Sequence, residues 1–387
     1  MSASIKDKIA IVGVGTTGFY KDAGKSVGAL VLDACVSAIR DAGLNAADVD
    51  GISGSLVVPA RYVQNGLGIP ACTWHANLTM PMQHQLIEAM NAVYSGACST
   101  ALVYHGVYRA PGASRSAAED PFRTRFGPGT NVLSPNPDTF EGAVGTAPWA
   151  ASYLHRYGVD RQVFGKIAIN SRSNAIDNVW AACRAPLTMS DYLSARYVRK
   201  PLCLLDLDYP VDGADALIVT TTDRARDLKR SPILIHVATL GQNDRPYSAQ
   251  MFDLSNTGQQ VATQQLWRRS DIGLEDMDVF YPYDGFSFLA VRWFEAVGYC
   301  GDGEAQAFFE DNWHDEQDRL LINGRVGVNT HGGSLSEGAT QGSGHIREAV
   351  LQLRNEAGSR QILDARHALI AQGGLFFNAG AIVLRAA

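Results

Sequence analysis

The sequence predicts an α/β protein with a buried, largely parallel or mixed sheet, built as two similar halves. Apolar strand-like runs alternate with helix-like runs that place apolar residues on one face, which favours helices packed against a sheet. The alternation starts again after Pro232, so the second half repeats the strand–helix order of the first. This restart indicates an internal structural duplication, although the halves share too little sequence to count as a repeat.

The first half contains most of the predicted helices. Residues 26–43 place apolar side chains near one helical face, and Gly43 suits the end of that helix. The predicted elements are strand 8–15, helix 26–43, helix 81–96, strand 100–109, helices 147–158 and 163–176, and a strand that continues into a helix over 214–228. Residues 110–142 are rich in proline, glycine, serine and charge, so we expect a long loop there that is functional or mobile.

The second half begins with a strand directly after Pro232. Its predicted elements are strand 233–241, helix 258–273, a strand ending within 279–287, helix 288–298, and a closing antiparallel pair at 368–374 and 379–387. The strands of this half are apolar, as expected for a sheet that is covered on both faces.

Composition and charge exclude several classes of protein. Hydrophobic residues make up 46% and charged residues 19%, a globular profile that excludes wholesale disorder. The net charge is −6 and no block of lysine or arginine occurs, so we expect no nucleic-acid partner. No apolar run approaches the roughly 18–20 residues that span a bilayer, and the N-terminus lacks the layout of a signal peptide, so we expect no membrane association.

The six cysteines are scattered and form no CxxC pair. Their spacing supports neither a disulfide framework nor a zinc site, so we interpret them as buried thiols of a cytoplasmic protein that binds no metal itself. The stretch 192–200 carries Arg196, Arg199 and Lys200. These residues suit either a basic lip for a coenzyme A phosphate or a solvated helix face.

A glycine pattern near the N-terminus resembles a nucleotide-binding motif. Gly13, Gly15 and Gly18 form GxGxxG directly after a predicted strand. A dinucleotide site needs its helix to begin at these glycines, so that the helix N-terminus faces the pyrophosphate. Here the next helix starts only near Ser26, so we interpret the glycines as a tight turn.

Several segments together resemble the thiolase superfamily. They are the opening strand and helix IAIVGVGTTGF and LVLDACVSAIRDAGL, the helix and strand IEAMNAVYSGACSTALVYHG, the segment VDGADALIVTT, and the loop GVNTHGGSLSEGATQGSGH. Residues 186–228 and 344–354 are similar to the bacterial lipid-transfer-protein branch of the sterol-carrier-protein-type thiolases. The resemblance covers nearly the whole chain.

The resemblance implies a thiolase fold, in which two duplicated βαβαβ halves pack as a layered α/β/α/β/α structure. The N-terminal half would cover 1–231, with a loop insertion near 110–142 and a helical segment over 147–212. The C-terminal half would cover 232–387. The family pairs its central sheets edge to edge, so a homodimer is expected.

The chain lacks the three groups with which thiolases work. Family spacing places the nucleophilic cysteine at Thr79, the histidine of the GHP motif at Ala339, and a second cysteine before the closing glycine pair, where AQGGLFF has none. Without a thiolate no acyl-enzyme forms, so ordinary thiolysis and Claisen condensation are not expected.

The branch resembles enzymes of steroid side-chain breakdown, which implies a retro-aldolase. Such an enzyme cleaves a β-hydroxyacyl-CoA into a short acyl-CoA and a ketone, here a steroid or another bulky ring ketone. The reaction needs a general base, a donor that stabilises the enolate, and an acid. The resemblance also implies a small partner with an OB-fold and a zinc ribbon, forming a heterotetramer, so any zinc would belong to that partner and this chain needs no cofactor of its own.

Three residues are the candidates for acid–base chemistry. Tyr283, in YPYDGFS, ends a strand beside the family's catalytic cavity, although a packed, hydrogen-bonded tyrosine is the structural alternative. An ordinary tyrosine pKa of about 10 requires a cationic or donor neighbour for a base at neutral pH. His331, in NTHGG, could polarise the thioester or relay a proton, or it could fix a turn. His345 begins a helix and could act or simply pack. Branch members place a second tyrosine where this chain has GATQG, so the acid–base pair stays open.

Four further residues are expected to bind or orient the substrate. Asn329 could hold the glycine-rich loop or donate to an oxyanion, and Asp284 could orient the strand end. Gly332 and Gly333 belong to the loop that lines the family's cavity.

Two other functions remain open. The chain could be an acyltransferase or thiolase with relocated catalytic residues, in which Cys72 or Cys98 would matter. It could instead be a non-catalytic subunit that binds acyl-CoA or lipid without turnover.

Overall fold

The structure is a computed structural model that describes residues 5–55, 57–78, 81–108, 142–243, 254–375 and 378–387. Strands and helices alternate around one twelve-stranded sheet, which confirms the predicted α/β class. Residues 110–141 of the expected loop lie outside the described residues, and residue 142 begins a helix. No helix among the described residues has the length and apolar character needed to cross a membrane.

The first half supplies five strands of the large sheet and several helices, of which the earlier ones cover these strands and α7 packs on the second half. Its elements are β1 (Ile9–Tyr20), α1 (Val27–Asp41), β2 (Gly51–Ser55), α2 (Ala60–Leu67), β3 (Trp74–Leu78), α3 (Met82–Ser95), β4 (Thr100–Val107), α6 (Gly142–Tyr157), α7 (Gln162–Ala175), α8 (Met189–Ser194), β5 (Tyr197–Arg199), β6 (Leu202–Cys203), β7 (Asp212–Thr221) and α9 (Thr222–Ala225). Strands β5 and β6 form a separate hairpin.

The second half follows after residue 232. Its elements are β8 (Ile233–Gly241), α10 (Gly258–Arg269), β9 (Val279–Pro282), α11 (Ser287–Val297), α12 (Ala305–Asp311), β10 (Trp313–His314), β11 (Arg319–Ile322), β12 (Val326–Val328), α13 (Gly333–Ser336), α14 (Ser343–Leu353), β13 (His367–Gln372) and β14 (Ala379–Ala386). The predicted closing pair is confirmed, because β13 and β14 are antiparallel from His367↔Arg385 to Gln372↔Gly380.

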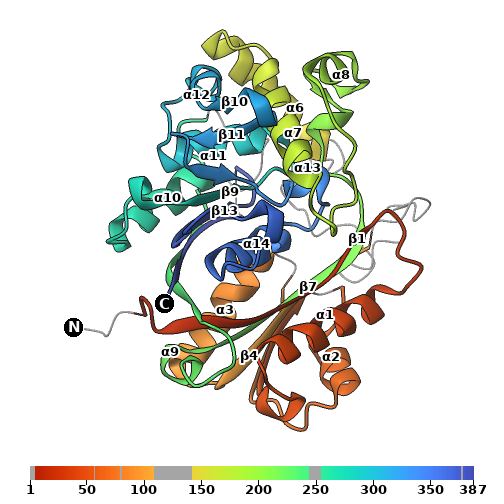
Figure 1. Ribbon diagram of the computed structural model, residues 1–387, viewed down its shortest axis with the longest axis vertical. Coiled ribbons are helices and arrows are strands. Elements are labelled where there is room, and N and C mark those ends of the chain that lie inside the picture. Colours follow the sequence, from red (N-terminus) through yellow and green to blue (C-terminus); the bar gives the residue numbers. More distant parts are fainter. Residues whose placement is uncertain (1–4, 56, 79–80, 109–141, 244–253, 376–377) are drawn as a thin grey trace.

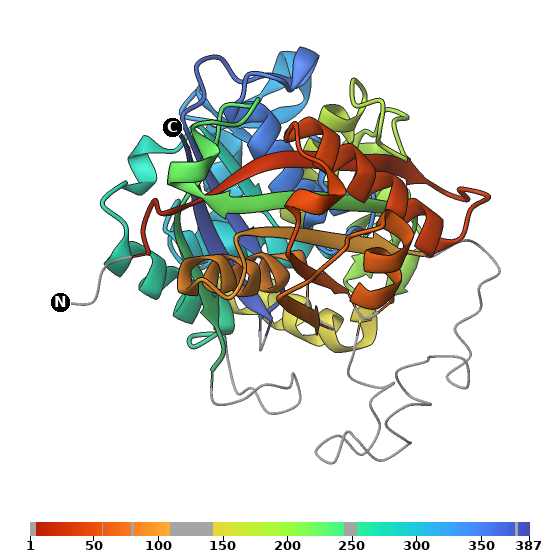
Figure 2. The ribbon, with the colours of Figure 1, turned by 90° about the horizontal axis from the view of Figure 1, so that it is seen from below.

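The two halves repeat one topology, so the predicted duplication is confirmed. The first half has the strand order β1-β7-β4-β2-β3, and the second has β8-β14-β13-β9-β12. In each order the first two neighbouring pairs of strands are antiparallel and the last two pairs are parallel. The halves join where β1 pairs with β8 at Ala10↔Leu234 and Ile11↔Ile233. In Figure 2 the red β1, the green β7 and the orange β4 lie side by side.

Helices form three layers around the sheet, which gives the expected α/β/α/β/α arrangement. Helices α3 and α14 lie between the two halves and contact strands of both as well as each other (Figure 1). Helix α1 covers the outer face of β1, β4 and β7, and α10 and α11 cover the outer face of the second half. The central helices are therefore enclosed, and any side chain on α14 that faces a neighbouring loop is shielded from water.

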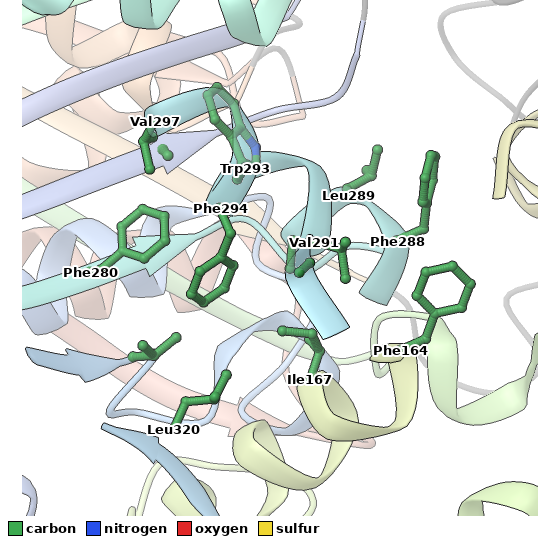
Figure 3. Packing of buried hydrophobic residues seen from close by; sticks show 14 of the residues in the cluster. Phe164, Ile167, Phe280, Phe288, Leu289, Val291, Trp293, Phe294, Val297 and Leu320 are labelled. Carbon is green, nitrogen blue, oxygen red and sulfur yellow. The ribbon is translucent and has the colours of Figure 1, made fainter. Parts of the chain in front are cut away.

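The core has one apolar cluster on each side of each half-sheet. The central cluster contains Met82 and Leu86 of α3, Ile346 of α14, and inward-facing residues of both half-sheets. The outer cluster of the second half is rich in aromatic rings, and Figure 3 shows Phe280 of β9, Phe294 of α11 and Phe164 of α7 among its members. Phe280 and Phe294 meet edge to face with centroids 5.1 Å apart, a favourable geometry for buried rings.

The interpretation of the N-terminal glycines as a tight turn is wrong for Gly13 and Gly15. Strand β1 runs through both residues to Tyr20, because it pairs with β7 along this length. A Cβ on Gly13 would lie 2.3 Å from the carbonyl oxygen of Ala38, and one on Gly15 would lie 2.2 Å from that of Ala34. Both glycines therefore allow α1 to pack directly on the strand. Gly18 alone has a left-handed φ, +73°.

Gly15→Ala tests this close packing. The added methyl group would overlap the backbone of α1, so we expect the free energy of unfolding to fall by about 1–3 kcal/mol. Denaturant unfolding measures the loss. Ser37→Ala, which removes an exposed hydroxyl from the same helix face, should change it by no more than about 0.5 kcal/mol. Equal effects of the two changes would contradict the packing role.

Candidate functional site

Three segments of the second half meet at one place beside the central helix α14. They are the end of β9 with Tyr283 and Asp284, the loop 329–333 that follows β12, and the first turn of α14. Strands β9 and β12 are parallel neighbours, paired at Gly327↔Val279 and Val328↔Phe280, so their carboxyl ends lie at the same edge of the sheet. The fold therefore brings the predicted residues of these segments together.

Asp284 anchors the loop to the strand end. Its carboxylate accepts hydrogen bonds from the backbone amides of Ser334, at 2.6 Å, and Leu335, at 3.3 Å, which open α13. The hydroxyl of Ser171, on α7, donates a third bond at 2.9 Å. Asp284 is fully buried, so these donors replace the water that its charge has lost. The predicted orienting role fits this geometry.

Gly332 and Gly333 allow the loop to turn tightly against its neighbours. Both have left-handed φ angles, +105° and +60°. A Cβ on Gly332 would lie 2.7 Å from that of Ala175, and one on Gly333 would lie 2.0 Å from the nearer carboxylate oxygen of Asp284. Both positions thus have a structural reason to be glycine, and substrate binding by this loop stays a prediction.

Asn329 holds the start of the loop in a conformation that most residues avoid. Its φ is +47°, and its side-chain amide donates to the carbonyl of Pro282 at 2.9 Å. Its own carbonyl accepts from the Gly332 amide at 2.8 Å. The Oδ1 atom is buried and accepts no hydrogen bond from the described residues. Asn329 therefore braces the loop, and its amide donor is occupied by the fold.

His331 and His345 form a buried pair. Their ring centroids are 4.7 Å apart at 75°, and both side chains are at most 1% exposed. Neither ring nitrogen of His331 has a hydrogen-bond partner among the described residues. Burial, together with the neighbouring His345, Arg347 and Arg360, holds the pKa of His331 well below its usual value, so this ring is neutral at neutral pH.

His345 lies between the pair and the strand end. Its Nε2 is 3.2 Å from the Oδ1 atom of Asp284, but the angle is not that of a hydrogen bond. The ring of Tyr283 packs on it with centroids 6.1 Å apart. Tyr283 is partly exposed, whereas both histidines are enclosed. Tyr283 is thus the member of this group that borders solvent, where a substrate would arrive.

Tyr281, which the sequence did not predict as a site residue, lies on β9 two residues before Tyr283. It is fully buried, and its hydroxyl is 3.1 Å from that of Thr330. Burial and the nearby Glu348 raise its pKa well above the usual tyrosine value. Its ring packs on His331 and His345 with centroids 5.7 and 6.4 Å away. Tyr281 therefore forms the wall behind the two imidazoles.

A buried charged network borders the histidines, and the sequence did not indicate it. Arg347 of α14 donates to Asp215 of β7 at 2.7 Å and also to Glu337. Asn178 donates to the carbonyl of His331 and to Oε1 of Glu337, both at 2.7 Å. Burial raises the pKa of Glu337 to about 7, although Arg347 opposes this shift. An aspartate within the apolar strand ADALIV was the one signal that the sequence offered.

The vacated thiolase positions lie in different surroundings. Thr79 is outside the described residues. Ala339 is buried, and its amide donates to the carbonyl of Tyr209 at 2.8 Å. Two histidines flank Thr79 in the sequence. One of them, His84, lies in the first turn of α3, and burial lowers its pKa to about 4. His75 is exposed on β3.

Burial favours the protonated form of five of the six cysteine thiols. Burial raises the pKa of Cys98 to about 12 and that of Cys203 to about 11, and it also raises those of Cys35, Cys72 and Cys300. A thiolate is the reactive form of cysteine, so these groups are poor nucleophiles at neutral pH. Among the described residues, no three histidine, cysteine, aspartate or glutamate side chains are arranged to hold a metal ion.

Known proteins of similar sequence are lyases and thiolase relatives. The chain is 29% identical to the 17-hydroxy-3-oxo-4-pregnene-20-carboxyl-CoA lyase of Mycobacterium tuberculosis, over 95% of this chain and 97% of that protein. It is 30% identical to a steroid side-chain-cleaving aldolase of Thermomonospora curvata, over 89% of this chain and 90% of that protein. The model of the family "Thiolase C-terminal domain-like" matches residues 241–386.

Solved structures give the same assignment of fold. The Ltp2-ChsH2(DUF35) aldolase superposes with a TM-score of 0.84 at 29% identity and covers 99% of each chain. Human mitochondrial 3-ketoacyl-CoA thiolase superposes with a TM-score of 0.67 at 15% identity, over 99% of this chain and 100% of that one, a likeness of fold alone. The predicted thiolase fold is thus confirmed.

Asp284→Ala tests the anchor of the loop. The change leaves two backbone amides and one hydroxyl without their buried acceptor, so we expect the free energy of unfolding to fall by at least about 2 kcal/mol. Denaturant unfolding measures the loss. Asp191→Ala, which removes a comparable but exposed cap from α8, should cost clearly less. A loss no larger than that of Asp191→Ala would argue against the anchoring role.

Proposed function

The chain belongs to the thiolase superfamily, in the branch of the steroid side-chain-cleaving aldolases, and from this membership we propose its reaction and substrate. It is a carbon–carbon lyase that cleaves a β-hydroxyacyl-CoA by a retro-aldol step. The products are a ketone, of steroid or similar ring type, and a short acyl-CoA. The name of the Mycobacterium tuberculosis relative specifies a 17-hydroxyl and a 20-carboxyl-CoA, so that relative's hydroxyl is β to the thioester carbonyl.

The observation that carries this function is the chemical character of the site. The groups gathered at the end of β9 are two imidazoles, a phenol and buried carboxyl groups. A retro-aldol step needs groups of this kind. A base removes the hydroxyl proton, the Cα–Cβ bond breaks, and its electron pair forms a thioester enolate that an acid then protonates. No covalent acyl-enzyme is required.

Tyr283 is the proposed base, because it borders solvent while the histidines behind it are enclosed. His345 packs on its ring, and the backbone amide of Tyr283 is fixed to the carbonyl of Ala371 at 2.8 Å. A rigid main chain favours a fixed position for the phenol relative to the substrate. Loop 329–333 is proposed to contact the thioester, with Asn329 bracing it.

The relocated-thiolase alternative is disfavoured by the state of the thiols. The Sγ atom of Cys72 is 2.9 Å from the carbonyl oxygen of Trp74, and Cys98 is buried against Gly51. Both thiols have raised pKa values, so a thiolate would have to form at an unfavourable position. The non-catalytic alternative predicts binding of acyl-CoA without turnover, which the assay below would detect.

The assembly is proposed to be a heteromer with a small partner chain. The name of the Ltp2-ChsH2(DUF35) aldolase pairs two proteins, and this chain covers 99% of the matched one. We propose a partner with an OB-fold and a zinc ribbon, so that zinc belongs to the partner and coenzyme A enters with the substrate. A homodimer through the edge of the sheet is also proposed, because β3 ends the strand order and its outer side can accept another strand.

Tyr283→Phe tests the proposed base. Loss of the hydroxyl should lower kcat for release of the ketone about 10²-fold or more, because general base catalysis contributes that much. The measurement uses a panel of β-hydroxyacyl-CoA substrates with the partner protein present. Tyr299→Phe removes a buried hydroxyl in the aromatic cluster away from the site and should leave kcat unchanged. Full activity of Tyr283→Phe would refute the assignment, and a wild-type protein that releases no ketone would refute the aldolase.

Cys72→Ala and Cys98→Ala separate the aldolase from the relocated thiolase. Since neither thiol takes part in a retro-aldol step, both variants should retain ketone release in the same assay. Loss of turnover in either variant, with unfolding behaviour like that of the wild type, would favour the thiolase alternative.

A further inference from the structure

We propose that Glu337 is a positioning residue that stores the proton exchanged with His331 during the lyase reaction. This role rests on the proposed retro-aldol function and adds a residue that neither the sequence nor the relatives indicated. It arises from three observations: the unpartnered atoms of Glu337 and His331, the closed surroundings of both side chains, and the fixed position of the other carboxyl oxygen of Glu337.

The two side chains face each other within a closed volume. Oε2 of Glu337 lies 3.9 Å from Nε2 of His331, and both side chains are 1% exposed. Neither atom has a hydrogen-bond partner among the described residues. Buried polar atoms of a stable protein are almost always paired, so two unpaired atoms that face one another require an explanation. A small rotation of either side chain would close the gap to hydrogen-bond length, as often occurs when a substrate binds.

The other carboxyl oxygen of Glu337, Oε1, is held in place by hydrogen bonds. Oε1 accepts from Asn178 at 2.7 Å and from Arg347. Asn178 also donates to the backbone carbonyl of His331 at 2.7 Å, so one amide group sets the positions of both partners. Position 344 has room for glycine and not for a larger residue, because a Cβ there would lie 2.3 Å from Oε2 of Glu337. The geometry therefore leaves one oxygen free for His331 and immobilises the other.

The charges around Glu337 allow its carboxyl group to hold a proton near neutral pH. The charge of Arg347 favours the carboxylate form of Glu337. Asp215 weakens this effect, because it also accepts a hydrogen bond from Arg347, at 2.7 Å. Glu348, on α14 with Arg347, adds further negative charge near Glu337, although Glu348 forms an ion pair with Arg360 at 2.8 Å. Burial is the largest effect, and together these groups raise the pKa of Glu337 to about 7. His331 is neutral, and the carboxyl group of Glu337, with its pKa of about 7, carries a proton in a substantial fraction of molecules at neutral pH.

The retro-aldol reaction requires a group that releases a proton when the enolate is protonated and regains it before the next turnover. When the substrate hydroxyl loses its proton to the site, the Cα–Cβ bond breaks and its electron pair becomes the enolate. The enolate carbon then forms a C–H bond with a proton that leaves the imidazole of His331, while the Oε2 proton of Glu337 moves to Nε2 of that ring. Tyr283 holds the proton taken from the hydroxyl. That proton then passes through the imidazoles of His345 and His331 to the Glu337 carboxylate, which returns both groups to their starting forms and balances protons over one turnover.

Glu337→Gln is the decisive variant, because glutamine keeps the size and the Oε1 acceptor but cannot release a proton. In the wild type with the partner protein, kcat should fall as pH rises through about 7, since the acid form of Glu337 is required. In Glu337→Gln, kcat should be about 10²-fold lower and this limb of the pH profile should vanish, while KM stays near the wild-type value. Glu337→Asp, which restores a carboxyl group, should recover part of kcat and the limb.

A matched control separates proton storage from the loss of a buried carboxylate. Glu295 is also buried, is paired with Arg292 and has a raised pKa, but it lies in the outer aromatic core. Glu295→Gln should keep the limb of the pH profile. Thermal unfolding of each variant shows whether it is folded, and infrared titration of the carboxyl C=O band shows whether a buried acid that titrates near pH 7 disappears in Glu337→Gln.

The outcomes separate this proposal from the proposed function. Wild-type turnover with an unchanged kcat and pH profile in Glu337→Gln would overturn the role of Glu337 and leave the aldolase intact. A wild type that releases no ketone from any substrate would overturn the function. In that case the infrared titration decides, because a carboxyl band unaltered by Glu337→Gln would overturn the assignment of the stored proton.

Discussion

The site depends on the hydrogen bonds that the fully buried carboxylate of Asp284 accepts. It joins the end of β9 to the two amides that open α13, and it also accepts a bond from Ser171 on the outer helix α7. Because the loop 329–333 runs directly into α13, its position follows from this anchor. The two glycines of the loop leave just enough room for the carboxylate and for α7. A rigid loop results, with its histidine directed inward.

Enclosure by the central layer then determines the electrostatics. Helices α3 and α14 lie between the two half-sheets, so side chains in the first turns of α14 are removed from water. Low water content favours the neutral imidazole of His331 and raises the pKa of the Glu337 carboxyl group to about 7, which suits proton transfer at neutral pH. The buried cation beside the histidines, Arg347, is shared by Asp215 and Glu337 and is flanked by the rings of Phe19 and Trp180. The charge of Arg347 is thus retained in the core because two carboxyl groups pair with it.

Local sequence patterns were sufficient for most of the fold. Strands β8, β13 and β14 and helices α1, α3, α7 and α11 fall where apolar periodicity predicted them, because each buries an apolar face in the layered core. The glycines near the N-terminus show the limit of such reasoning. A GxGxxG pattern has the same letters whether it forms a turn or receives a helix, and only the packing of α1 on β1 distinguishes the two.

The sequence by itself determined the fold class and the duplication, because these depend on periodicity and on the order of the elements. Its resemblance to the thiolase superfamily implied the loss of the catalytic cysteines. It also indicated that Tyr283, Asp284, His331 and His345 could share one site. Only the tertiary structure decided that the two imidazoles meet in a closed volume and that Glu337 and Arg347 stand beside them. The physical reason is that a charged side chain in a polar, glycine-rich segment has no local signature of burial. Its environment is created by strands β7 and β9 and helix α14, which are distant in the chain and become neighbours only when the halves fold together.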